Sequence, residues 1–195
     1  LTYRCVARPA RVRVAAMRTW MKALLAGAAL AAVVPAANAA TINVTTTADV
    51  VAPNDGKCSL REAVLQAGFG NQTIADCAPG APGEDVVQLE AGDYRPTASS
   101  QDQFGGDLDL TGSNSVRIAG RGMGVTSISA VADRVAQVDS GASLGLTDLT
   151  VRDGLAGSGG DGGAIQSRGS LTALRVAFVN NAAGDGQPGT SFSDS

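Results

Sequence analysis

Histidine is absent from the 195-residue chain, and aromatic residues make up only 4% of it. Without histidine there is no Ser-His-Asp triad, no imidazole proton shuttle and no His-ligated metal site. Few aromatic rings also leave few large side chains for a bulky core or for stacking against sugars. The 25 glycines and the many small or β-branched residues instead favour short strands and tight turns that repeat along the chain.

Basic residues are scarce in most of the chain. Six of the 15 lysines and arginines lie before residue 40, whereas all 18 acidic residues lie after it. The segment from residue 40 onward therefore has nine basic and 18 acidic side chains, which is a net charge of −9. We expect no nucleic acid and no anionic lipid surface as a partner, because both need a basic patch.

An apolar run from Ala23 to Val34 follows a positively charged stretch and precedes the small residues Ala37-Asn38-Ala39. This order is typical of a signal peptide, and the run is too short to cross a bilayer comfortably. We predict a signal peptide over residues 17–39 and an exported protein, extracellular or on the outer cell surface, with no transmembrane span in its mature part. An uncleaved anchor is the alternative. Residues 1–16 fit no export pattern, and we interpret them as an over-extended gene start.

The chain has only three cysteines, and one of them, Cys5, lies in that over-extended start. The other two, Cys58 and Cys77, would enter an oxidising compartment after export, and we predict that they form a disulfide. Closing a loop of about twenty residues contributes roughly 3 kcal/mol to stability in the chain-entropy model. Two buried free thiols are the alternative.

One helix is expected in the mature chain, over residues 58–68. Ser59 and Glu62 have the S-x-x-E spacing of a helix capping box, and Gly68 supplies a stop. This spacing gives Glu62 a structural role, and we expect Arg61 to lie across the cap or on the surface rather than to form a catalytic pair with it. We assign residues 40–85 to an N-terminal cap that contains the helix and the disulfide.

Short apolar alternations recur beyond residue 85. One column of apolar pairs begins at Val87, Val116, Leu144 and Leu171, with spacings of 29, 28 and 27 residues. Two further columns begin at Leu108, Ala136 and Ala164, and at Leu149 and Val176. Three strands per repeat predict an all-β fold, a parallel β-helix of about four coils over residues 86–184. A β-sandwich is the alternative, and we interpret residues 185–195 as a disordered tail or a truncation point.

Two sets of residues resemble known families. Residues 58–63 read C-S-L-R-E-A and resemble the signature of the CSLREA domain of secreted bacterial β-helix proteins, and residues 87–94 are similar to that family's first coil. Gly162-Gly163-Ala164-Ile165 and Phe178-Val179-Asn180-Asn181 resemble the G-G-A-I and F-x-x-N repeats of polymorphic outer membrane proteins. The resemblance implies a right-handed parallel β-helix at or released from the cell surface, with a surface receptor or a polysaccharide as its partner.

Acidic residues are the remaining candidates for chemistry. They fall into two sets, Asp102, Asp107 and Asp109, and then Asp148, Asp153 and Asp161. If either set converges it can bind Ca²⁺ or cleave a glycoside; the alternative is that these residues lie in solvated turns. We predict a non-catalytic, adhesin-like or carbohydrate-contacting protein with no catalytic residue, no metal site and no cofactor. A polysaccharide lyase or glycoside hydrolase on the same scaffold is the alternative.

The leader yields a first testable prediction. The mature protein should begin at or near Ala40, because Ala37 and Ala39 supply the small side chains that a signal peptidase accepts. N-terminal sequencing of exported protein measures this directly. Recovery from a membrane fraction of a chain that still begins at Met17 would contradict it.

Overall fold

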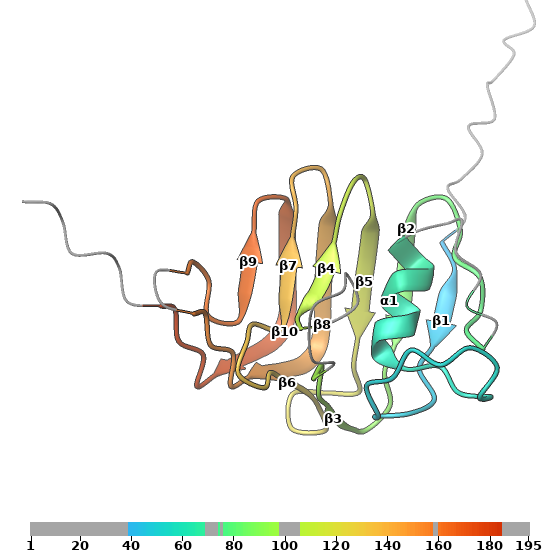
Figure 1. Ribbon diagram of the computed structural model, residues 1–195, viewed down its shortest axis with the longest axis horizontal. Helices are drawn as coiled ribbons and strands as arrows, with labels where there is room; N and C mark the ends of the chain where they lie inside the picture. Colours follow the sequence, from blue (N-terminus) through green and yellow to red (C-terminus); the bar gives the residue numbers. More distant parts are fainter. Residues whose placement is uncertain (1–38, 69–73, 75, 98–105, 158–159, 185–195) are drawn as a thin grey trace, which may run out of the picture. The chain divides into compact units, whose positions relative to one another are not determined.

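Parallel strands stack along the chain so that each pairs with a strand one turn later (Figure 1). The computed structural model describes residues 39–68, 74, 76–97, 106–157 and 160–184. The predicted gene start, the predicted tail and all of the predicted signal peptide except Ala39 lie outside these residues. The prediction of a parallel β-helix with one short helix near its start is confirmed, and the β-sandwich alternative is wrong.

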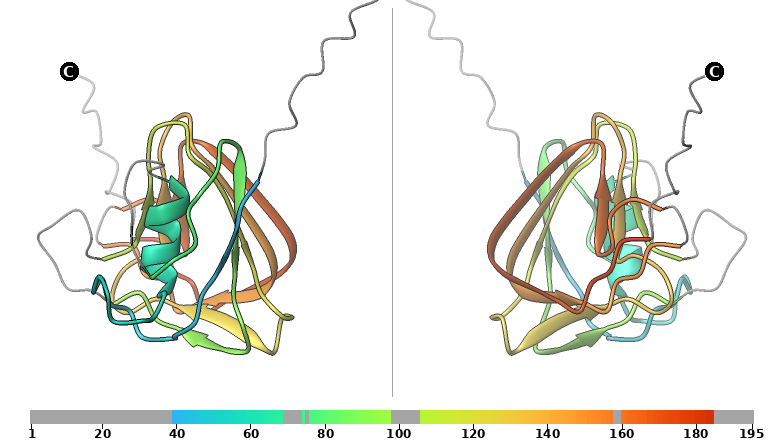
Figure 2. Two further views of the ribbon diagram at one scale, coloured as in Figure 1. Left: turned by 90° about the vertical axis from the view of Figure 1, so that its right-hand side faces the viewer. Right: turned by 90° about the vertical axis from the view of Figure 1, so that its left-hand side faces the viewer.

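The elements, in chain order, are β1 (Thr41–Asn43), α1 (Leu60–Gly68), β2 (Glu84–Gln88), β3 (Gly92–Tyr94), β4 (Leu108–Leu110), β5 (Ser115–Ala119), β6 (Thr126–Ser129), β7 (Ala136–Val138), β8 (Ser143–Arg152), β9 (Ile165–Ser167) and β10 (Ser170–Val179). Viewed from its ends, the stack has three walls (Figure 2). The first wall contains β1, β2, β5 and the first halves of β8 and β10, and the second contains β3, β6 and the other halves of β8 and β10. The third wall is the separate sheet β4-β7-β9.

The two longest strands, β8 and β10, show how a turn is built. β8 and β10 are ten residues long because each passes from the first wall to the second without a break. Both have a residue with positive φ near the middle, Asp148 at 53° and Arg175 at 54°, where the strand bends. β2 to β4, β5 to β7 and β8 to β9 make about three turns, so the predicted four coils are too many. The predicted count came from four apolar pairs, all of which lie in strands of the first wall. The last of these strands is the first half of β10, which begins a further turn that the described residues do not complete.

Side chains that point inward stack in columns and form the core. One column contains Ile42, Val87, Ile118 and Leu146, none of them more than 2% exposed. In the third wall Leu108 lies on Ala136, as the spacing predicts. Strands of adjacent turns are only about 4.8 Å apart, so each layer covers the one before it. Small and branched side chains therefore fill this narrow interior.

The first step of the repeat differs from the predicted one. Val87 pairs with Ile118 rather than with Val116, so the step is 31 residues long instead of 29. Asp85 takes the inward position opposite Val116 and is fully buried, with its carboxylate accepting a 2.8 Å hydrogen bond from the Ala40 N–H. An inward aspartate is invisible to a pattern of apolar residues, which is why the predicted register was two residues off.

Helix α1 closes the N-terminal end of this interior (Figure 1). Its apolar side chains, Leu60, Val64 and Leu65, are at most 7% exposed and belong to the same core as the strands. The helix contacts strands of the first and third walls. Within the described part of the chain, none of the helical residues forms a segment both long enough and apolar enough for a membrane crossing.

The predicted disulfide is present and ties the two sides of the cap together. Cys58 immediately precedes the N-cap of α1, and Cys77 lies beyond its other end, with their Cα atoms 5.0 Å apart. Next to Cys77, the Asp76 carboxylate accepts hydrogen bonds from the N–H groups of Asp55 and Gly56. The bridge and these bonds hold the loop before α1 against the segment after it.

We predict that Cys58→Ser lowers the free energy of unfolding by about 3 kcal/mol, because the unfolded chain regains the entropy of an open loop. Urea denaturation of the full chain measures this. Cys77→Ser should have the same effect. Equal stability of both variants and the wild type would contradict the prediction.

Candidate functional site

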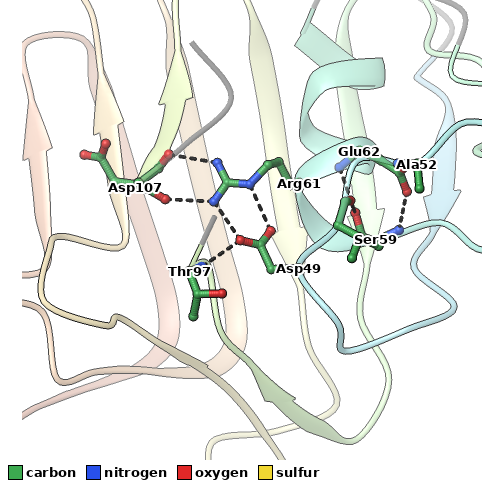
Figure 3. Close-up of polar contacts among 9 residues, drawn as sticks. Asp49, Ala52, Ser59, Arg61, Glu62, Thr97 and Asp107 are labelled. Atoms are coloured by element: carbon green, nitrogen blue, oxygen red, sulfur yellow. Dashed lines mark hydrogen bonds and ion pairs between the residues drawn. The ribbon is translucent and has the colours of Figure 1, made fainter. Parts of the chain in front are cut away.

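The signature residues at the start of α1 form a capping box. The Ser59 N–H donates a 2.9 Å hydrogen bond to Glu62, and the Glu62 N–H donates one of 3.2 Å to Ser59 Oγ (Figure 3). Glu62 also accepts from the Ala52 N–H, and the Ser59 hydroxyl donates to the Val50 carbonyl. Both side chains are fully buried. They satisfy the backbone of the helix start and its preceding loop, which is a structural role.

Arg61 lies across the cap and is buried, so the surface position that the sequence also allowed is wrong. It is 3% exposed, and its Nε and Nη2 atoms donate to the two carboxylate oxygens of Asp49 at 2.9 and 3.0 Å. The same guanidinium donates to the carbonyls of Gly106 and Asp107, just before β4 (Figure 3). Arg61 thus links the cap to the first turn. The sequence carries no signal for Asp49 as its partner, because Asp49 lies in an irregular loop.

Two of the three aspartates in the first predicted set come together outside the third wall. Asp107, just before β4, and Asp109, within β4, flank the inward Leu108 on the outer side of the wall, where Asp107 is buried and Asp109 is half-buried. Asp107 forms an ion pair with Arg134, and the Arg134 Nε lies 3.2 Å from the Asp107 Oδ2. The third member, Asp102, lies outside the described residues.

Burial and neighbouring charge set the ionisation of this pair. The pKa of Asp109 is raised to about 6, first by burial and then by the like charges of Asp107 and Asp139. Burial also raises the pKa of Asp107, and the hydrogen bond from Arg134 partly opposes that rise. Asp109 is therefore the group of this cluster whose charge changes near neutral pH.

A row of polar side chains crosses the outer face of the third wall. Asp109, Gln137 and Gln166 pair in register on β4, β7 and β9, so they follow one another at the strand spacing of about 4.8 Å. Gln137 accepts from Arg134 at 3.3 Å and donates to Asp139 at 3.4 Å. Asp109, Gln137 and Gln166 are half-buried, and Asp107 is buried. We call this face, from Asp107 and Arg134 to Gln166, the polar row.

The second predicted set of aspartates is not a site. Asp148 forms an ion pair with Arg175, and Asp153 lies 3.7 Å from Arg152 at the next corner. Asp161 is exposed in the loop before β9. Across residues 39–68, 74, 76–97, 106–157 and 160–184, no three acidic or thiol side chains gather as ligands for a metal ion.

Sequence reasoning missed Asp93 on β3, a carboxylate with four partners. Ser127 and Ser129 donate to it from β6, and Arg95 and Arg152 form ion pairs with it. Burial opposes its ionisation, but these hydrogen bonds together hold the pKa of Asp93 well below its usual range. Only the one-turn stacking of β3 on β6 could have indicated this cluster. Its hydrogen-bond and ion-pair partners all belong to the chain, so the group is internally satisfied.

The two repeat motifs meet at one corner of the helix. Gly162 has a positive φ of 69°, and a Cβ on Gly163 would lie 2.4 Å from the Ala182 backbone. Next to them, the Asn181 side chain accepts from the Gly154 N–H at 2.8 Å and donates to the Val151 carbonyl at 3.1 Å. The glycines let successive turns approach closely, and Asn181 satisfies backbone groups of the preceding turn.

The remaining members of these motifs belong to strands. Ala164 is buried next to Ile165, the first residue of β9, while Phe178 takes an inward position in β10 but is 48% exposed. The motifs are therefore structural units of the coil.

We predict that Arg61→Met lowers the free energy of unfolding by about 3–5 kcal/mol, because it leaves a buried Asp49 carboxylate without its cation. The matched control is Arg175→Met, which removes an equally bidentate but exposed pair with Asp148 and should change stability little. Urea denaturation of both variants gives the comparison. Similar losses in the two variants would contradict a special role for Arg61.

We also predict that Asp109→Asn stabilises the protein at pH 7. The folded pKa of about 6 lies above the usual value near 3.9, so the wild type loses stability as pH rises from about 4 to about 6. With screening of a half-exposed group, the variant should gain about 1 kcal/mol at pH 7 and nothing below pH 4. Thermal unfolding at pH 4 and pH 7 tests this. Asp148→Asn is the control and should give no gain, since the pKa of Asp148 is lowered by Arg175.

Comparisons with protein-family models, with curated proteins and with solved structures found no match to this chain. The likeness of residues 58–63 and 87–94 to the CSLREA family is therefore a prediction about family that rests on those residues.

Proposed function

We propose that this protein is a non-catalytic, exported β-helix that binds a carbohydrate or a surface receptor through the polar row. The observation that carries the proposal is the in-register alignment of Asp109, Gln137 and Gln166 on a rigid three-stranded sheet. Amide and carboxylate groups offer both donors and acceptors to hydroxyl groups. Their repetition from turn to turn suits a ligand that is itself extended.

The groups around the row support binding rather than turnover. Arg134 joins Asp107 to Gln137, and Gln137 joins Arg134 to Asp139, so the row is oriented before any ligand arrives. Orientation in advance lowers the entropic cost of binding. Because the chain has few aromatic residues, recognition would rely on hydrogen bonds more than on stacking.

The enzyme alternative has one observation in its favour. Asp109, with a pKa of about 6 next to Asp107, has the property of a general acid, and glycoside hydrolysis uses two carboxyl groups. Against it, Asp107 is engaged by Arg134. An activity that needs Asp109 would favour a hydrolase or lyase over a binding protein.

Export is the second part of the proposal. The order of charge, apolar run and small residues in positions 17–39 supports it, and a Cys58–Cys77 disulfide suits an oxidising compartment. Surface exposure or release would bring the polar row into contact with extracellular polymers.

Calorimetry and reducing-end assays with acidic and neutral polysaccharides test this function. We expect binding without cleavage, and Gln137→Ala or Gln166→Ala should weaken it about tenfold, the cost of a lost hydrogen bond. Ser143→Ala, an outward residue of the first wall, is the matched control and should bind normally. Cleavage that Asp109→Asn abolishes would overturn the non-catalytic proposal, and equal weakening by all three alanine variants would remove the polar row from it.

A further inference from the structure

The three aligned side chains of the polar row do not bond to one another. Asp109, Gln137 and Gln166 stand on β4, β7 and β9, which lie side by side in the third wall (Figure 1). Gln137 bonds instead to Arg134 and Asp139. Among the described residues, neither the Asp109 carboxylate nor the Gln166 amide has a hydrogen-bond partner. Polar side chains in a stacked ladder often satisfy each other, so these groups are available to a ligand.

The core fixes the separation of the three side chains. The residues next to Asp109 and Gln137 along their own strands point inward and are at most 1% exposed. Because side chains alternate along a strand, Asp109 and Gln137 lie on the outer face, and Gln166 continues the row in register on β9. The wall therefore holds one polar group per strand at the strand spacing of about 4.8 Å.

This spacing distinguishes between classes of extended ligand. An extended peptide advances about 3.3 Å per residue, so successive peptide residues do not coincide with successive strands. A β-1,4-linked sugar chain is also extended, and each of its rings is about as long as the strand spacing. The rings have hydroxyl groups at both edges, and an amide offers a donor and an acceptor to either edge. A sugar chain parallel to the stack therefore places one ring on each strand.

The charge of the wall separates neutral from acidic sugar chains. Burial, and then the like charges of Asp107 and Asp139, raise the pKa of Asp109 to about 6. A carboxylate of a ligand would add another negative charge at this place, and Arg134 is already paired with Asp107. A neutral sugar avoids this repulsion, because its hydroxyl groups donate to a carboxylate without bringing a charge of their own.

We propose that the ligand of the polar row is a neutral, extended β-1,4-linked sugar chain that runs parallel to the stack, with one ring against each of β4, β7 and β9. This inference rests on the function proposed above and adds the class, the direction and the register of the ligand. Two adjacent rings always include the central position, where Arg134 and Asp139 orient Gln137 before the ligand arrives. Asp109 and Gln166 hold the rings on either side.

Calorimetry with the dimer and trimer of β-1,4-linked glucose tests the register on the full chain. The trimer should bind about tenfold more tightly than the dimer, the value of one further hydrogen bond. Gln137→Ala should weaken both oligomers about tenfold. Asp109→Ala and Gln166→Ala should weaken the trimer about tenfold but the dimer only about twofold, because the dimer still has a second pair of positions.

The matched control for these variants is Ser143→Ala, on the outer face of the first wall, which should bind both oligomers as the wild type does. The melting temperature checks that each variant remains folded.

Two other trimers test the class of the ligand at pH 7. β-1,4-linked glucuronate differs from the glucose trimer only in its carboxylates and should bind at least about tenfold more weakly. β-1,3-linked glucose has the same rings in a coiled chain, which cannot follow the strand spacing, and should be weakened to a similar extent.

Three results would overturn this inference and leave the proposed function standing, provided that binding still depends on the polar row. These are equal affinity for the dimer and the trimer, equal loss of dimer affinity in Gln137→Ala and Gln166→Ala, or binding of either other trimer as tightly as the glucose trimer. If the wild type binds no sugar chain of any kind, both the inference and the carbohydrate function are wrong.

Discussion

A side chain that points into a β-helix is buried only when one layer lies below it and another above it, because successive strands are a single spacing apart. The ends of the stack therefore need a closure that is not a regular coil. At the N-terminal end α1 supplies it, and Arg61 fastens the helix to the first turn through Asp49 and the carbonyls of Gly106 and Asp107.

The same constraint separates the roles of the carboxylates. Asp49 and Asp85 lie in the interior or at its edge, and each is satisfied by donors distant in sequence. Asp109 lies on an outward face, where it is flanked by Asp107 and Asp139, and its pKa is raised. Asp85 is satisfied inside the fold, whereas Asp109 is half-buried on the outer face of the third wall.

Much of the fold was predictable because it rests on short spacings. The capping box needs two side chains three residues apart, and the disulfide needs two cysteines in a chain that has few. The columns from Leu108 to Ala136 and from Leu149 to Val176 repeat at a nearly constant interval. The predicted length of the first repeat was wrong because Asp85 occupies an inward position. A polar residue there needs hydrogen-bond partners, which the spacing of apolar residues does not predict.

The sequence by itself determined that the chain stacks short parallel strands behind one capped helix, since both features depend on the spacing of neighbouring residues and on the recurrence of apolar pairs. The tertiary structure alone decided which polar residues meet. Arg61 pairs with Asp49 across the cap, and Asp107 and Asp109 lie on the same wall. Asp148 and Asp153, by contrast, pair with two different arginines. These contacts depend on register between turns, which one buried carboxylate can shift by two residues.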